Sequence, residues 1–238
     1  MNRCNFTLKH YKEIIILAKE KGYVFSDFFK KPGFGKRIYM RHDVDISLNN
    51  ALKMAEIENR ERIKSTYLIL LDSPHYNIFQ EKYMKIIKRI SGLGHDIGIH
   101  YNWKMKSKEQ VARDVIGQHR FLTSLSLPIK KIVSFHRPSK KILGKTFSQF
   151  PSTYEPDFFI KTKYISDSNR IWREGCLCQF LTKSSCQNLQ VLIHPIWWNE
   201  KDLSYVGIYQ KLKKQKIKDV KIGLASDVSA YKNLFKDL

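Results

Sequence analysis

The chain has 238 residues, of which 42% are hydrophobic, including 14 Phe and 12 Tyr, enough for one large packed core. No repeat, low-complexity segment or Gly-, Ser- or Pro-rich linker interrupts it, so the sequence predicts a single domain over residues 1–238. The run IIILA near the start is too short for a signal peptide, and no apolar run is long enough to cross a bilayer. We therefore expect a cytoplasmic protein.

The formal net charge of +21 would suit nucleic acid, an anionic membrane surface or a phosphorylated substrate. The lysines are scattered along the chain, and no zinc-finger, RNP-type or basic-zipper motif accompanies them. Solvated lysine-rich faces therefore explain most of the charge. We expect no specific nucleic-acid partner, whereas peripheral association with an anionic membrane stays open. The sequence does not predict an oligomeric state.

The four cysteines are too few, in a chain of this length, to form a disulfide framework. Cys176 and Cys178 in CLC, together with Cys186, do not match the spacing of a common zinc site. The cysteine pattern alone therefore does not predict a metal site.

The predicted elements alternate between helix and strand. Thr7 can cap a helix that ends at Gly22. The strand RIYMRHDVD follows, then a helix from about Ser47 to Arg60. The next run, STYLILL, is apolar throughout and suits a strand buried on both faces.

The second half of the chain continues the alternation. A helix near residues 76–91 precedes the strand HDIGIHYN, and Ser107 with Gln110 forms a capping box for another helix. The strands that follow are KIVSFH, KYISDS and LQVLIHP, and after them a last helix and a final strand, VKIGL. This order predicts an α/β fold with a parallel sheet, either closed as a barrel or open and doubly wound.

Polar residues gather at the carboxyl ends of these strands, where both architectures place active sites. They are Asp43, Asp45, His100, His136, Arg137, Asp167 and His194. Because alternate side chains of a strand share a face, Asp43 and Asp45 should project together. Two carboxylates so close need a cation, a shared proton or full solvation. The pattern therefore favours one shared site.

The segments RHDVD, GHDIGIHYN, SFHRPS and LIHPIWW, in this order, resemble the motifs of the polysaccharide deacetylase family, also called the NodB homology family or carbohydrate esterase family 4. The resemblance covers about residues 38–225 and leaves 1–35 as an N-terminal helical extension. It implies a distorted (β/α) barrel of about seven strands. The implied reaction is metal-dependent removal of an acetyl or formyl group from an amino sugar, as in members associated with bacterial surface-polysaccharide biosynthesis.

The resemblance also implies roles for individual residues. Asp43 would be the general base, and Asp45 and His100 would bind the metal, which we expect to be zinc. His194 matches the family's general acid. Asp167 could orient His194 or bind substrate.

The sequence departs from the family pattern at Lys104, where a second metal-binding histidine is expected. A protonated ammonium cannot bind zinc. His136 is our candidate replacement, since it lies where the family carries the arginine that orients the base, and Arg137 beside it would keep part of that function. His95 is a poorer alternative, because its odd spacing from His100 puts it on the opposite face of the strand.

Trp197 and Trp198 follow the last motif, and their rings would suit stacking on a sugar, as would Tyr101. Core packing is the alternative for the two tryptophans. The substrate would be an N-acylated amino sugar, and the basic charge favours a nucleotide- or lipid-linked one. Lys104 also motivates a second hypothesis, a catalytically inactive deacetylase-like protein that binds glycan. A nucleic-acid-binding protein has only the composition in its favour.

Overall fold

The computed structural model describes residues 4–104, 106–232 and 234. It divides into two units, Met1–Glu200 and Lys201–Leu238. The first unit contains the sheet and every predicted site residue. The second is formed by α7 (Tyr205–Asp227) and α8 (Ser229–Lys232). The prediction of one domain over residues 1–238 stays a prediction.

The first unit is built on seven strands that pair only in parallel. In chain order the strands are β1 (Val24–Ser26), β2 (Arg37–Val44), β3 (Thr66–Leu70), β4 (Asp96–Asn102), β5 (Ile129–His136), β6 (Lys163–Ser166) and β7 (Asn188–Ile193). The sheet order is β5-β4-β3-β2-β7-β6, with β1 beside β2. The predicted α/β class and distorted barrel of about seven strands are thus confirmed, although the sheet of the described residues does not close between β5 and β6.

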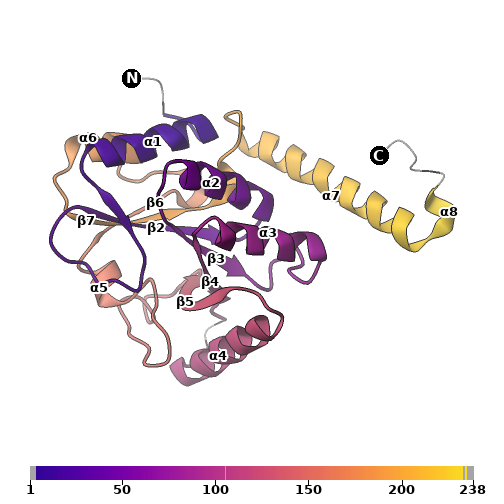
Figure 1. Cartoon of the computed structure of the whole chain (residues 1–238), viewed down its shortest axis with the longest axis horizontal. Helices are drawn as coiled ribbons and strands as arrows, with labels where there is room; N and C mark the ends of the chain where they lie inside the picture. Colours follow the sequence, from indigo (N-terminus) through magenta and orange to yellow (C-terminus); the bar gives the residue numbers. More distant parts are fainter. Residues whose placement is uncertain (1–3, 105, 233, 235–238) are drawn as a thin grey trace. The chain divides into compact units, whose positions relative to one another are not determined.

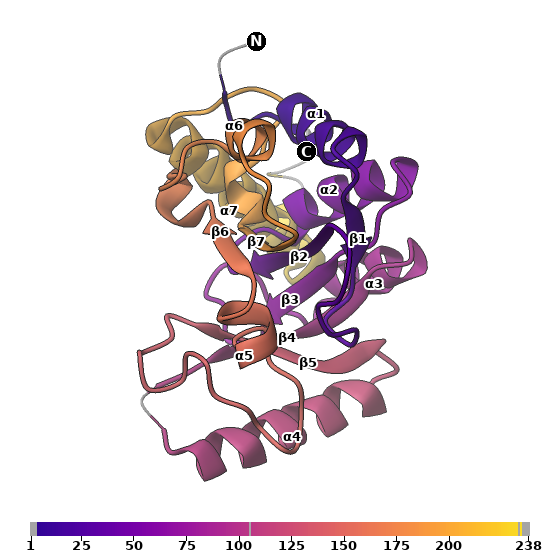
Figure 2. The ribbon, with the colours of Figure 1, turned by 90° about the vertical axis from the view of Figure 1, so that its left-hand side faces the viewer.

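Helices cover the sheet between successive strands (Figures 1 and 2). They are α1 (Leu8–Glu20), α2 (Leu48–Arg60), α3 (Glu81–Gly92), α4 (Lys108–Ser124), α5 (Pro156–Phe159) and α6 (Leu177–Lys183), with short 3₁₀ turns η1 (Ser168–Arg170) and η2 (Pro195–Trp197). Helix α2 contacts both α1 and α3, and α4 packs on β4 and β5. The caps predicted from sequence are present: Thr7 accepts from the His10 amide, and Ser107 and Gln110 form the capping box.

The predicted final strand is wrong, because residues 220–224 lie inside α7. Ile217, Val220 and Leu224 recur at helical spacing, and this period decides the local structure over the β-branched residues of VKIGL. Helix α3 also begins at Glu81, later than predicted. Strand β1 and the short helices α5 and α6 were not predicted.

The inner face of the sheet has an apolar floor beneath the polar strand ends. The residues of this floor, all buried, are Phe28, Tyr39, Leu68, Ile132 and Phe158. Gly98 on β4 lies at the same level. A Cβ atom on Gly98 would approach the Ile132 carbonyl oxygen to 2.4 Å, so only glycine lets the neighbouring backbone pack this closely. This apolar floor lies on the same face of β2 as Arg41 and Asp43, because Tyr39 alternates with them along the strand.

His42 points to the opposite face of β2, where it joins a buried polar network on α2. Its Nε2 lies 2.6 Å from Glu58 Oε1, and Tyr67 donates to Glu58 Oε2 at 2.6 Å. The Tyr11 hydroxyl also donates to Glu58. Burial raises the pKa of Glu58, but the His42 charge and these hydrogen bonds outweigh it and lower the pKa from 4.5 to about 2. Glu58 is therefore a buried carboxylate on α2 whose hydrogen bonds connect this helix to α1, β2 and β3.

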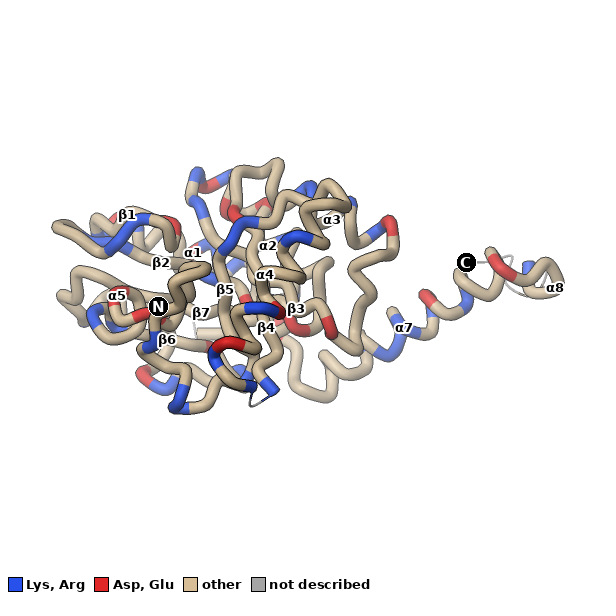
Figure 3. Tube along the Cα trace, turned by 90° about the horizontal axis from the view of Figure 1, so that it is seen from below, with Lys and Arg blue, Asp and Glu red and all other residues tan. Residues whose placement is uncertain are grey.

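No helix among the described residues combines the length and apolar character needed to cross a membrane. Lys and Arg are spread along the chain trace in Figure 3, as the sequence suggests.

We predict that Glu58→Gln lowers the free energy of unfolding by about 3–5 kcal/mol, since it leaves His42 and two tyrosine hydroxyls without their charged partner. Urea unfolding followed by circular dichroism measures the loss. Glu56→Gln, at a half-buried position of the same helix, is the control and should change stability by about 0.5 kcal/mol or less. Equal effects of the two substitutions would show that the Glu58 network does not hold the helices in place.

Candidate active site

The candidate site lies at the carboxyl ends of β2, β4, β5, β6 and β7. Because these strands are parallel, their carboxyl ends meet at one edge of the sheet. Asp43 lies on β2 with Asp45 just after it, and His100 and His136 are on β4 and β5. Asp167 and His194 directly follow β6 and β7. The structure therefore brings six of the predicted residues to one place.

Asp45, His100 and His136 converge on a common point. Asp45 Oδ1 lies 3.1 Å from His100 Nε2 and 3.3 Å from His136 Nδ1, and the two imidazole nitrogens are 3.3 Å apart. The pairing of β4 with β5 explains this, since Asn102 lies opposite His136 and His100 lies opposite Ser134. His136 can thus reach His100 from the neighbouring strand.

The hydrogen bonds around His100 determine which nitrogen faces Asp45. Ser134 Oγ donates to Asp43 Oδ1 at 3.1 Å and lies 2.5 Å from His100 Nδ1. Its oxygen therefore accepts from the Nδ1–H of His100, which leaves Nε2 facing Asp45, the nitrogen that would bind a metal.

This group of side chains fits a divalent metal. One carboxylate and two imidazoles are an established ligand set for zinc with a position left open. Asp45 Oδ1 is buried and accepts no hydrogen bond from a described residue. Burial raises the pKa of Asp45, but the His100 and His136 imidazoles outweigh it and hold the pKa well below its usual range. Asp45 is therefore ionised, the form that binds metals.

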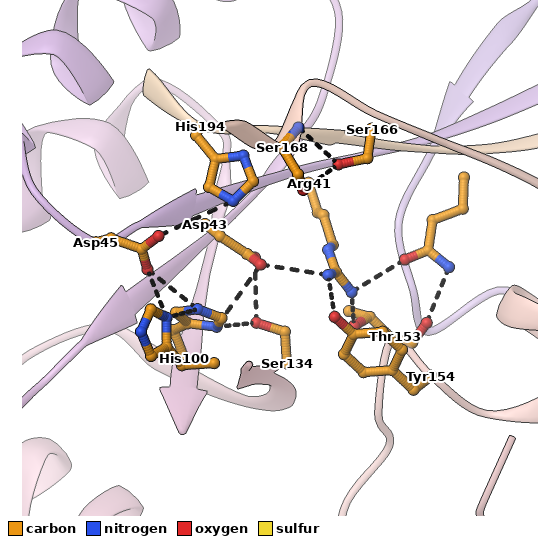
Figure 4. Close-up of polar contacts among 12 residues, drawn as sticks. Arg41, Asp43, Asp45, His100, Ser134, Thr153, Tyr154, Ser166, Ser168 and His194 are labelled. Atoms are coloured by element: carbon orange, nitrogen blue, oxygen red, sulfur yellow. Dashed lines mark hydrogen bonds and ion pairs between the residues drawn. The ribbon is translucent and has the colours of Figure 1, made fainter. Parts of the chain in front are cut away.

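Asp43 is buried and held from two sides (Figure 4). Arg41 donates through Nη2 to Asp43 Oδ2 at 3.2 Å, and Ser134 donates to Oδ1. His100 Nδ1 is 3.7 Å from Asp43 Oδ2. These contacts orient the carboxylate and balance its charge in a buried position.

Arg41 is fully buried beneath Asp43 and is itself enclosed by polar groups. It donates to Gln190 Oε1 at 3.1 Å, to the Tyr154 hydroxyl at 2.7 Å and to the Thr153 hydroxyl. Its guanidinium also lies 4.5 Å from the centre of the Tyr154 ring. The guanidinium is therefore fixed in position and cannot leave Asp43 without losing several buried partners.

His194 is held by Asp167. Its Nδ1 lies 2.7 Å from Asp167 Oδ1, and its backbone amide donates to both carboxylate oxygens at 2.9 and 3.1 Å. Trp198 Nε1 donates to Asp167 Oδ2 at 2.9 Å. With Nδ1–H donated to Asp167, Nε2 of His194 faces the site, 3.9 Å from Asp45 Oδ2.

The pKa of His194 is raised from 6.5 to about 9. Burial lowers the pKa, but the hydrogen bond and negative charge of Asp167 outweigh it, with smaller contributions from Asp43 and Asp45. His194 is therefore protonated near neutral pH and can donate a proton from Nε2.

Lys104 and His95 both lie away from the site. Lys104 is exposed, and its Nζ is 3.5 Å from Asp72 Oδ2 rather than near Asp45. His95 is on the far face of the sheet, where Nε2 contacts the Ala55 carbonyl oxygen at 3.0 Å. Of the two candidates for the missing ligand, only His136 lies beside Asp45 and His100.

Three other assignments need correction. Trp198 is completely buried, so it cannot stack on a sugar, and its indole instead supports Asp167. Tyr101 faces away from His100, as the alternation of a strand requires, and its hydroxyl donates to Asp114 at 2.6 Å.

Arg137 is exposed, and no contact links it to Asp43 among the described residues. Trp197 is half-buried against the core, and substrate binding by it stays a prediction.

Sequence reasoning missed two residues that hold Asp43, namely Arg41 and Ser134. Arg41 lies two residues before Asp43 and Ser134 two before His136, so strand alternation places each on the inner face. The same rule that paired Asp43 with Asp45 could have identified both.

We predict that Asp45→Ala, His100→Ala and His136→Ala each bind one equivalent of zinc less per chain than the unaltered protein. Asp43→Asn should keep the metal, because Asp43 lies on the Nδ1 side of His100, whereas Nε2 is the nitrogen that faces Asp45. Lys104→Ala is the control and should lose none. Elemental analysis after gel filtration measures the ratio. Full zinc retention in His136→Ala would leave His136 with an orienting role only.

Comparison with known proteins gives matches among solved structures alone. No protein-family model matches the chain, and no curated protein does. A carbohydrate esterase family 4 pseudoenzyme from Bacillus anthracis matches with 17% identity and a TM-score of 0.46, over 76% of this chain. The chain spans only 62% of that pseudoenzyme's length.

Two further structures are described as family 4 carbohydrate esterases. The one from Bacillus anthracis has 14% identity and a TM-score of 0.42, with 88% of this chain and 86% of the other covered. The one from Streptomyces lividans, in complex with acetate, has 11% identity and a TM-score of 0.44, with 76% and 89% covered. At such identities a similar fold does not establish a similar reaction. This chain resembles the polysaccharide deacetylase family in the order of its motifs, in its parallel seven-stranded α/β fold and in the polar residues that meet at its strand ends.

Proposed function

We propose that this protein is a metal-dependent amidohydrolase that removes an N-acyl group, acetyl or formyl, from an amino sugar. The observation that carries the proposal is the convergence of three sets of side chains at one edge of the sheet. These are a buried carboxylate oriented by Arg41, a carboxylate and two histidines suited to a metal, and a histidine paired with Asp167.

Asp43 is the proposed general base. Its two oxygens are held by Arg41 and Ser134, so the carboxylate keeps one orientation toward the ligand group. A base in this position accepts a proton from the attacking water as the water adds to the acyl carbon. The buried Arg41 guanidinium balances the charge of this carboxylate.

Asp45, His100 and His136 would hold the metal, and zinc is the ion we propose. A divalent cation supplies Lewis acidity to the carbonyl oxygen and lowers the pKa of a bound water. The hydrogen bond from His100 Nδ1 to Ser134 fixes the ring that presents Nε2. Ser134 therefore couples the orientation of the ligand His100 to that of the base Asp43.

His194 is the proposed general acid. An amine is a poor leaving group and needs a proton as the C–N bond breaks. Asp167 fixes Nδ1–H of His194 and raises its pKa to about 9, so the opposite nitrogen, Nε2, carries a proton to the nitrogen of the leaving sugar amine. Trp198 supports this pair from the core.

The alternative hypothesis of an inactive glycan-binding protein rests on Lys104, which would neutralise Asp45 if it pointed into the site. Lys104 instead pairs with Asp72, and His136 lies beside Asp45. No contact among the described residues therefore favours the inactive alternative over the enzyme.

The net charge of +21 supports a substrate that carries phosphate, such as a nucleotide- or lipid-linked amino sugar. We propose an intermediate of bacterial surface-polysaccharide synthesis, handled in the cytoplasm or at its membrane surface. The free state of all four cysteines agrees with a reducing compartment.

The proposed role of His194 predicts a difference between two kinds of substrate. His194→Ala should lower hydrolysis of an N-acetylated chitin oligosaccharide by roughly 10²- to 10⁴-fold. It should spare an activated aryl acetate, whose leaving group departs without a proton. Release of acetate and of the aryl alcohol measures the two rates. Equal loss on both substrates would assign His194 to another step, and no activity of the unaltered protein on any N-acyl amino sugar would reject the proposed function.

The pairing of Asp167 with His194 predicts a shift in the pH dependence. Because His194 must be protonated to act, amide hydrolysis falls as the pH rises through its pKa. Asp167 raises that pKa, so Asp167→Asn should move the falling limb to lower pH, by about 1–3 units. A pH–rate profile from pH 5 to 10 measures it. Asp157→Asn, at a surface carboxylate bound to Lys161, is the control, and an unmoved limb in Asp167→Asn would contradict the role of this pair.

A further inference from the structure

A second group of metal-binding side chains lies away from the active site. Cys4, His10, Cys176 and Cys178 each offer a ligand atom, and these atoms all lie within 4.8 Å of one another. Cys4 Sγ is 3.3 Å from Cys178 Sγ, and His10 Nε2 is 3.3 Å from Cys176 Sγ. His10 and Cys176 are buried, and all the cysteines are free thiols.

The four residues come from two distant parts of the chain. Cys4 precedes α1, and His10 lies in its first turns, where Thr7 caps the helix through the His10 amide. Cys176 and Cys178 lie at the start of α6, which packs against α1. The fold thus joins side chains up to 174 positions apart.

Glu13 fixes the orientation of His10. Its Oε2 lies 3.2 Å from His10 Nδ1, so the imidazole donates Nδ1–H to the carboxylate and turns the Nε2 lone pair toward the thiols. A histidine that binds zinc is commonly held by a carboxylate in this way. A buried histidine that only fills space would not need its second nitrogen directed at three sulfur atoms.

We propose that Cys4, His10, Cys176 and Cys178 bind one structural zinc ion. Three thiolates and one imidazole form a closed tetrahedral set of the kind found in structural zinc sites. Zinc–ligand bonds of about 2.0–2.3 Å place the ligand atoms of a tetrahedron roughly 3.5–3.8 Å apart, close to the separations of 3.3 Å and within the limit of 4.8 Å. On binding, each thiol loses its proton to solvent and nothing is oxidised or reduced.

The proposed ion would join the N-terminal segment to α6, and a chain of contacts connects it to the active site. Phe6 follows Cys4 and packs against Trp198 and Trp172, with ring centres 5.1 and 6.4 Å away. Trp198 in turn donates to Asp167, the partner of His194. The zinc would therefore stabilise the packing of Phe6 on Trp198, and through Trp198 and Asp167 it would support the proposed general acid without contacting substrate.

The experiment uses cobalt as a spectroscopic substitute for zinc. Full-length protein, stripped of metal under reducing conditions and loaded with Co²⁺, should show thiolate-to-cobalt charge-transfer absorption. Cys176→Ser and Cys178→Ser should lose it, whereas Cys186→Ser should keep it, because Cys186 lies outside the group. His100→Ala should also keep it, which separates this site from the one proposed for catalysis.

Two measurements on chains that keep the sulfur ligands guard against misfolded variants. An organomercurial reagent that blocks thiols should release one equivalent of zinc from the unaltered protein, and His100→Ala should release the same amount. Glu13→Gln should weaken zinc binding by about 10-fold or more in competition with a chelator. No thiolate absorption with cobalt, no zinc released by the mercurial, or a Cys4–Cys178 disulfide in protein prepared under reducing conditions would each overturn the proposal.

Discussion

The buried ion pair between Arg41 and Asp43 is the interaction on which the rest of the site depends. A carboxylate in this position would be strongly penalised without a partner, because it lies 3% exposed above an apolar floor. Arg41 supplies the partner from two residues earlier on β2 and is itself held by Gln190, Thr153 and Tyr154. Buried hydrogen bonds from β7 and from the segment after β5 thus hold Arg41 in place. Arg41 in turn fixes Asp43 without the help of substrate or metal.

Strand alternation on β2 separates two polar networks that would otherwise interfere. Arg41, Asp43 and Asp45 face the inside of the sheet, whereas His42 faces the helices and pairs with Glu58. The short motif RHDVD therefore serves stability on one face and the candidate site on the other. A shift of one residue in the register of β2 would exchange the two networks, burying Asp43 against α2 and turning His42 into the site. Both networks thus specify the register of the strand.

The sequence predicted most of the fold and the location of the site, because helical and strand periods and polar strand ends are local signals. It failed at VKIGL, where apolar residues fit both periods over a short stretch. It also failed at Tyr101 and Trp198, because an aromatic residue near a polar strand end can face either the site or the core. Arg41 was within reach of the alternation rule. The group of Cys4, His10, Cys176 and Cys178 was not, because only the folded chain joins α1 to α6 and the CLC spacing by itself is uninformative.

The two departures from the family motifs compensate for each other under the proposed function. The resemblance expects a histidine at position 104 and an arginine at position 136, and this chain has Lys104 and His136 instead. Because β5 pairs with β4 so that His136 lies opposite Asn102, the imidazole can reach Asp45 and His100. That exchange removes the arginine from β5, and Arg41 on β2 donates to Asp43 in its place. His136 thus takes the ligand position that Lys104 leaves open in the proposed site, and Arg41 provides the guanidinium beside Asp43 from a different strand.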